Sequence, residues 1–178
     1  MAAGKPMKGG AAYLVGLEYG PIKIGVTSQP PYRRSRAARR SFYRDYWDYR
    51  DYEAELYGSW PHDYAYMVEK LAHMYLMDHH ITGEWFDVSI YKARRAVAKV
   101  IRLLDTGWKN KVTKDNWFRR HGLKRKYIIE CFGMDAEQVM KKYNGLVRLD
   151  WSLPKEEKQN KLRETYRARV KRKANAER

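Results

Sequence analysis

The most constraining stretch of this chain is residues 11–26, AAYLVGLEYGPIKIGV, which contains two short apolar runs. The runs are residues 13–17 and 22–26, and a glycine and a proline lie between them. Glycine and proline between two β-prone runs predict a β-hairpin. Tyr13, in the first run, and Lys23, inside the second, are unusual for a purely structural hairpin. A lysine between two isoleucines commonly faces solvent, so the local sequence leaves a structural and a functional interpretation about equally open.

The pairing register decides whether Tyr13 and Lys23 lie together, because successive side chains in a strand point to opposite faces of the sheet. Pairing Tyr13 with Gly25 and Val15 with Lys23 places both side chains on one face, whereas a shift by one residue separates them. Joint action of the two side chains therefore requires this register and a loop with an odd number of residues. We expect Gly20 to adopt a positive φ in that loop.

The charge balance of the chain indicates a polyanionic partner. Its 178 residues carry 37 Lys and Arg against 21 Asp and Glu, a formal net charge of +16. Such an excess favours nucleic acid first and an anionic membrane surface second. Hydrophobic residues make up 44% of the chain, which is enough for a buried core. The length suits one domain with an appendage, or two small domains.

Other features of the sequence disfavour several protein classes. No apolar run reaches the ~18 residues of a membrane-spanning helix, and residues 1–12 lack the apolar centre of a signal peptide. Cys131 is the only cysteine, so no internal disulfide forms, and no zinc-binding spacing can be assembled with the five histidines. We expect a cytoplasmic, DNA-associated protein without membrane contact, and a flexible N-terminus over residues 1–10.

Five motifs occur in the order and spacing of one nuclease family. They are Ala11-Ala12-Tyr13, Lys23-Ile24-Gly25, Arg33, the pair Glu69 and His73 in a helix-like segment, and Gly83-Glu84-Trp85-Phe86. In this combination the chain resembles the GIY-YIG nuclease superfamily, in particular its phage and restriction-type branch. In that branch the second tyrosine motif is often KIG and the domain closes with GEWF. The resemblance covers roughly residues 11–90, about half of the chain.

The resemblance implies an α+β fold for residues 11–104, in which helices flank a three-stranded antiparallel sheet. Residues 55–60 are then the third strand, and the GEWF motif begins a short edge element whose Trp85 and Phe86 belong to the core. The asparagine that the family usually carries late has no clear counterpart after Phe86.

The resemblance also assigns roles to the candidate site residues. Glu69 would hold Mg2+ or Mn2+, Arg33 would stabilise the phosphate, and Tyr13 and Lys23 would orient or activate the attacking water. A tyrosine acts as a base only if neighbouring cations lower its pKa from about 10, and Lys23 and Arg33 are such neighbours. His73 fits an E-x-x-x-H variant of the family and is either catalytic or a packing residue.

Two segments show helical periodicity. In residues 64–80 an apolar stripe contains Met67, Leu71, Met74 and Tyr75, while Glu69 and His73 share a different face. Without the resemblance, a lone glutamate on a helix is generally solvated. Residues 90–104 predict a second amphipathic helix that ends at residues 106–107.

Basic residues follow the hairpin. Arg33, Arg36 and Arg40 lie near one face of an expected helix, and Arg34 replaces Arg33 if the register slips by one. Such a run is most often a solvated basic face. The aromatic-rich residues 41–60 are either strand and core residues or a surface that stacks on bases.

The C-terminal part is more basic than the rest. Residues 105–178 contain 21 Lys and Arg against 10 Asp and Glu, which is +11 of the total +16. We expect residues 105–153 to form a small helical DNA-binding region and residues 154–178 a solvent-exposed helix or a disordered basic arm. Residues 126–145 match a helix-turn-helix weakly, Gly145 is expected to end a helix, and residues 146–153 are expected to be a strand or an extended connection.

These features favour a metal-dependent endonuclease acting on double-stranded DNA, of restriction, homing or phage type. The expected DNA-binding residues are Arg34, Arg36, Arg40, Lys124, Arg125, Lys126, Arg167, Arg169, Lys171 and Arg172. A catalytically inactive GIY-YIG-like binding module is the alternative. A structural RNA-binding protein is a third interpretation, supported by charge alone, and its RNA partner is less favoured than DNA. The sequence leaves open whether the protein is a monomer or a homodimer.

Overall fold

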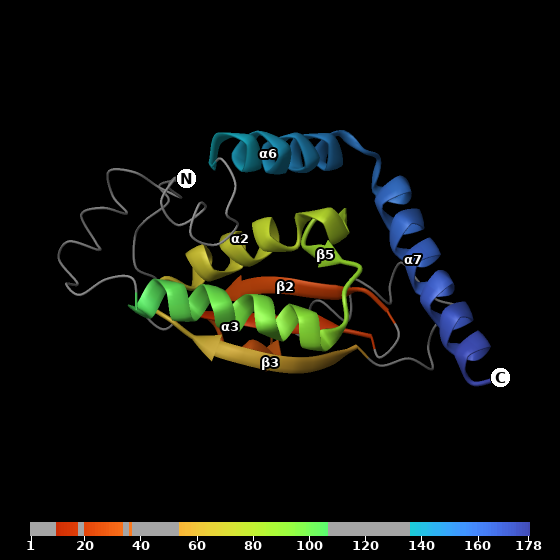
Figure 1. Ribbon diagram of the computed structural model, residues 1–178, viewed down its shortest axis with the longest axis horizontal. Coiled ribbons are helices and arrows are strands. Elements are labelled where there is room, and N and C mark those ends of the chain that lie inside the picture. The colour runs from red at the N-terminus through yellow and green to blue at the C-terminus, as the bar shows by residue number, and fades with distance from the viewer. Residues whose placement is uncertain (1–9, 18–19, 34–35, 37–53, 107–135) are drawn as a thin grey trace.

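The computed structural model describes residues 10–17, 20–33, 36, 54–106 and 136–178. Within them the chain forms an α+β fold around an antiparallel sheet of five strands in the order β3-β1-β2-β5-β4 (Figure 1). The strands are β1 (Ala11–Gly16), β2 (Ile22–Thr27), β3 (Glu55–Pro61), β4 (His80–Thr82) and β5 (Trp85–Phe86). None of the helices among these residues is long and apolar enough to cross a membrane.

The hairpin of β1 and β2 has the predicted register. Tyr13 pairs with Gly25 and Val15 pairs with Lys23, so Tyr13 and Lys23 lie on one face of the sheet. The expectation for Gly20 was wrong, because Gly83 is the glycine with positive φ among the described residues. Close packing explains the glycine instead, since a Cβ on Gly20 would lie 2.6 Å from Cβ of Leu17.

The sheet has two more strands than the three that were expected. β4 and β5 form a short hairpin that pairs with β2, where Ile22 lies opposite Phe86 and Lys23 opposite Trp85. The GEWF motif is therefore not at the edge of the sheet, because β4 occupies that position. Gly83 joins the two strands with φ of 54°, a conformation that favours glycine. Phe86 is buried in the core as expected.

One face of the sheet packs against two helices, α2 (Ala65–Tyr75) and α3 (Ile90–Thr106). A 3-10 turn, η2 (Met77–His79), follows α2. The predicted apolar stripes form the core on this side together with strand residues such as Leu14 and Ile24. Tyr75 is the exception: it is 37% exposed, and the Nζ atom of Lys99 lies 4.6 Å from the centre of its ring.

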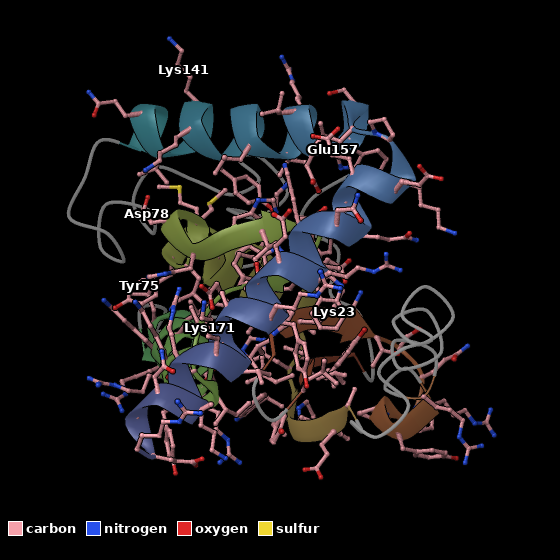
Figure 2. The ribbon with its side chains drawn as sticks, turned by 90° about the vertical axis from the view of Figure 1, so that its right-hand side faces the viewer. Lys23, Tyr75, Asp78, Lys141, Glu157 and Lys171 are labelled. Carbon is pink, nitrogen blue, oxygen red and sulfur yellow. The ribbon has the colours of Figure 1, made fainter. Side chains whose placement is uncertain are left out.

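The opposite face of the sheet packs against α7 (Lys155–Ala176), which crosses in front of it in Figure 2. Leu162 and Tyr166 of α7 are buried in a cluster with Tyr13, Val15 and Leu17. The C-terminal segment is therefore a helix, as one expectation held, but it is not a wholly solvated one. Its apolar residues are spaced by one helical turn, which gives it a buried face despite its high charge.

The helix α6 (Ala136–Ser152) lies on the side of α2 that faces away from β2 (Figure 1). It contains both Gly145 and residues 146–152, so the expected helix end and extended connection were wrong. The residues that α6 turns inward recur at helical spacing: Val139, Tyr143, Leu146, Val147 and Asp150. A Cβ on Gly145 would meet no atom within 4 Å, so the helix passes through it without a packing requirement. The first half of the predicted helix-turn-helix, residues 126–135, lies outside the described residues.

Candidate active site

Lys23 forms an ion pair with Glu84 at one end of the sheet. Its Nζ atom lies 2.6 Å from Oε2 of Glu84, which belongs to the turn between β4 and β5. The backbone explains this proximity, since Lys23 lies opposite Trp85 and the N–H of Ile24 donates to the carbonyl of Glu84 at 3.1 Å. The GEWF motif thus places a carboxylate beside the lysine of the KIG motif.

Glu69 approaches this pair from α2 and is only 8% exposed. Burial and then the negative charge of Glu84 raise its pKa to about 8, while Lys23, the backbone N–H of Val26 and Lys70 act in the opposite direction. At pH 7 and without a cation, this carboxyl group therefore holds its proton for most of the time. A solvated glutamate, which the helix pattern alone suggested, would not behave in this way.

His73, one turn after Glu69, is buried and held in one orientation. Its Nε2 atom lies 2.9 Å from the carbonyl oxygen of Ile24, so Nε2 donates and carries the proton. The hydroxyl of Tyr143 lies 3.5 Å from Nδ1, and the ring packs against Phe86 with centroids 5.0 Å apart. Burial lowers the pKa of His73 to about 4, so the imidazole is neutral at pH 7. These contacts favour a packing and orienting role for His73.

Tyr13 shares its sheet face with Lys23 but is 3% exposed. Its ring lies over Gly25, where a Cβ would come within 2.5 Å of the hydroxyl oxygen. The glycine of the KIG motif therefore leaves the space that the tyrosine occupies. Leu162 and Tyr166 of α7 belong to the same buried cluster, so this side of the site is covered by the C-terminal helix.

A pocket of about 520 Å3 lies between the Glu69 region and α6. Glu69, His73 and Glu84 line it from one side, and Tyr143, Asn144 and Asp150 line it from α6. Sequence reasoning missed this contribution of α6. The available signal was Asp150, a lone carboxylate at helical spacing from Tyr143 and Val147.

Asp150 connects α6 to the turn that carries Glu84. It is 5% exposed, accepts a hydrogen bond of 2.6 Å from the hydroxyl of Thr82 and also accepts from the backbone N–H of Gly83. Buried carboxylates are tolerated when hydrogen-bonded in this way. The contact fixes the turn on which Glu84 faces Lys23.

Comparison with known families places residues 10–104 in the T5orf172 domain. The match covers more than half of the chain, from just before β1 to the last turn of α3. The chain belongs to the T5orf172 domain family. This domain is related to nucleases, which indicates a nuclease or a DNA-binding role. No curated protein and no solved structure matches the chain.

The T5orf172 domain contains every residue that was predicted for the catalytic site. The structure brings Lys23, Glu69 and His73 together with Glu84, and it places Tyr13 on the sheet face of Lys23. Arg33 is exposed on a helical segment that begins at residue 31.

The residues predicted to bind DNA are spread over three parts of the chain. Arg36 is exposed, whereas Arg34, Arg40, Lys124, Arg125 and Lys126 lie outside the described residues. On α7, beyond the T5orf172 domain, Arg167, Lys171 and Arg172 are exposed (Figure 2 labels Lys171). Arg169 instead forms an ion pair with Asp87 and donates to the carbonyl of Gly20 at 3.2 Å.

Proposed function

We propose that this T5orf172 protein is a metal-dependent endonuclease of GIY-YIG type that hydrolyses DNA phosphodiester bonds. The observation that carries the proposal is the buried carboxyl group of Glu69 beside the Lys23–Glu84 ion pair, inside a nuclease-related domain. Burying an ionisable group costs stability, and strongly shifted pKa values gather at functional sites. A domain that only had to fold could place an apolar residue at position 69.

The residues around Glu69 fit a divalent cation. The charge of Glu84 raises the pKa of Glu69, and a cation near both carboxylates would favour their ionised forms. Mg2+ often binds through one or two carboxylates and keeps several waters, so Glu69 would hold Mg2+ or Mn2+ in the adjoining pocket. The described residues contain no cluster of three or more His, Cys, Asp or Glu that would complete a protein-only site. When bound, the cation would polarise the phosphoryl oxygens.

The other proposed roles follow from the chemistry of each side chain. Arg33 would clamp the phosphate, since a guanidinium binds two phosphate oxygens at once. Lys23, charged and paired with Glu84, would orient the attacking water and hold positive charge near it. Tyr13 would accept the proton of that water if neighbouring cations lower its pKa.

A catalytically inactive DNA-binding module is the second candidate, and two observations favour it. Tyr13 is almost wholly buried in a cluster with α7 residues, and Lys23 is engaged by Glu84. Such a domain would bind DNA without reaching the scissile phosphate.

Cleavage of supercoiled plasmid separates the two functions. Wild type, Glu69→Ala and Glu157→Ala are compared with Mg2+ and with EDTA; Glu157 is an exposed glutamate of α7 (labelled in Figure 2) and serves as the control. The endonuclease predicts nicking or linearisation that requires Mg2+, is lost in Glu69→Ala and is kept in Glu157→Ala. Equal activity in Glu69→Ala would refute the site assignment. Tight binding without cleavage by any of the three would establish the binding module.

A further inference from the structure

The outer surface of α3 carries a stripe of cations that the catalytic site does not use. Lys92, Arg95, Lys99 and Arg102 are spaced three, four and three residues apart, so they follow one side of the helix. They line an open groove of about 710 Å3 together with Tyr75 and Tyr91, and none of the described residues that line it is acidic. A solvated helix face typically mixes both signs of charge, so this composition needs a further explanation.

Lys92 and two carboxylates near the groove have identified partners among the described residues. Nζ of Lys92 lies 2.6 Å from Nε2 of His79, an interaction with an imidazole rather than with a carboxylate. The nearby Asp78 pairs with Lys142, at 2.5 Å, and Asp105 lies 3.1 Å from Nε2 of His62.

Two tyrosines flank the cations. Tyr91 is 76% exposed and Tyr75 is 37% exposed, which makes them two of the large side chains that the described surface leaves in solvent. Tyrosine hydroxyls and basic side chains both bind the phosphate and sugar oxygens of DNA. An acidic peptide would form ion pairs with the cations but would make fewer contacts with the two tyrosine side chains.

The length of the stripe suits a strand of DNA. Residues 92 to 102 span about 15 Å at ~1.5 Å per helical residue. Phosphates of one strand of B-DNA advance ~3.4 Å along the axis, so about four phosphates lie within this length.

We propose that the α3 groove binds the phosphate backbone of DNA, outside the catalytic site. It lies on another flank of the molecule, as Tyr75 and Lys23 are on opposite sides of α7 in the view of Figure 2. The groove thereby fixes the path of the duplex relative to the Glu69 site. The choice of DNA as the polyanion rests on the proposed function, whereas the test below does not require cleavage.

The test measures binding of a fluorescent duplex of about 20 base pairs in EDTA over a series of salt concentrations. The variant Lys92→Gln/Arg95→Gln is compared with Arg94→Gln, which removes a charge from an exposed position of the same helix outside the groove. Each lost phosphate contact lowers the slope of log K against log salt by ~0.9. The groove variant should lower the slope by nearly 2 and weaken binding by about tenfold or more at ~0.1 M salt, while Arg94→Gln should do neither.

A second variant, Tyr91→Ala, separates the aromatic contribution from charge. It should weaken binding by about fivefold or more without changing the salt slope, because a contact made by a neutral side chain releases no counterions. All substituted side chains are exposed, so equal far-UV circular dichroism and equal melting temperatures are expected of the folded variants.

Three results would overturn the proposal. They are an unchanged slope in the groove variant, an equal loss per removed charge in Arg94→Gln, and competition by polyglutamate as effective as by DNA of equal charge, which would indicate an acidic protein partner. Binding in EDTA is independent of catalysis. Plasmid cleavage with an unchanged salt slope would therefore reject the groove alone, and a reduced slope without any cleavage would reject the nuclease alone.

Discussion

Glu69 and His73 are two ionisable side chains on adjacent turns of α2, and burial keeps both neutral at pH 7 when no cation is bound. Burial raises the pKa of the carboxyl group to about 8 and lowers that of the imidazole to about 4, because in each case it penalises the charged form. The two residues differ in their contacts. His73 is fixed by a backbone carbonyl and by Phe86, whereas Glu69 faces the pocket near a second carboxylate. The site is therefore prepared for a positive charge next to Glu69.

The raised pKa of Glu69 predicts a pH-dependent cost to stability. The pKa of Glu69 in the folded protein, about 8, exceeds its ordinary value of 4.5. Below pH 4.5 the carboxyl group is protonated in both the folded and the unfolded chain, and its burial lowers the free energy of unfolding least. As the pH rises from 4.5 through 8, the unfolded chain ionises more readily than the folded protein, so the free energy of unfolding falls. Urea unfolding in EDTA should show that Glu69→Gln gains stability relative to wild type across this interval, of the order of a few kcal/mol, since one pKa unit is worth about 1.4 kcal/mol. Parallel pH curves for the two proteins would contradict this account of the site.

At the level of elements, the hairpin and its register were predictable, because an apolar run, a turn and a second run leave few alternatives. The strands β4 and β5 were not, since they have three and two residues and are too short to show a period of two. The turn between them nevertheless carries Glu84, so the partner of Lys23 could not be identified without these strands. The sequence motifs identified Glu69 as a candidate, but the pocket that it lines is completed by Glu84 and by residues of α6, which no local pattern places there.

The helix α6 was misread for a physical reason. Glycine at 145 resembles a helix end, and Leu146, Val147 and Leu149 suggest an extended run, yet residues 139, 143, 146, 147 and 150 keep the helical period. Sequence reasoning gave more weight to the glycine than to this spacing. Glycine inside a helix costs only about 1 kcal/mol, which the packing of α6 exceeds.

The link between α6 and the β4–β5 turn gives a prediction at this scale. Asp150→Ala removes the acceptor for Thr82 and for the N–H of Gly83, and leaves a buried donor without its acceptor. The free energy of unfolding should fall by about 1–3 kcal/mol in urea denaturation. Asp150→Asn, whose amide oxygen still accepts a hydrogen bond, should recover part of the loss. Wild-type stability in Asp150→Ala would mean that this contact does not hold the turn.

At the scale of the whole molecule, α7 connects the basic C-terminal part to the sheet face that carries Tyr13. The sequence predicted its charge and left a helix and a disordered arm open. It did not predict the docking, because only a few apolar residues in a highly charged helix mark the buried face. The ion pair of Arg169 with Asp87 joins the same two parts. This helix was expected to contribute to DNA binding, and it also covers part of the domain.

Docking of α7 predicts that truncating its buried residues weakens the entire fold. Leu162→Ala should lower the free energy of unfolding by about 2 kcal/mol or more, in a single transition seen by both circular dichroism and tryptophan fluorescence. Asn160→Ala, at an exposed position one half-turn away, should change it by less than about 0.5 kcal/mol. An unchanged transition in Leu162→Ala would show that α7 is an independent arm.

The central claim is that Glu69 supports phosphodiester hydrolysis, and a single-turnover experiment tests it most directly. A labelled DNA duplex that the wild type cleaves is mixed with excess wild type or excess Glu69→Gln, with Mg2+, and the affinity of each preparation for the same duplex is measured in EDTA. The account predicts that Glu69→Gln loses cleavage by about a hundredfold or more and binds DNA about as tightly as wild type. Cleavage at the wild-type rate by Glu69→Gln, with equal binding, would contradict it.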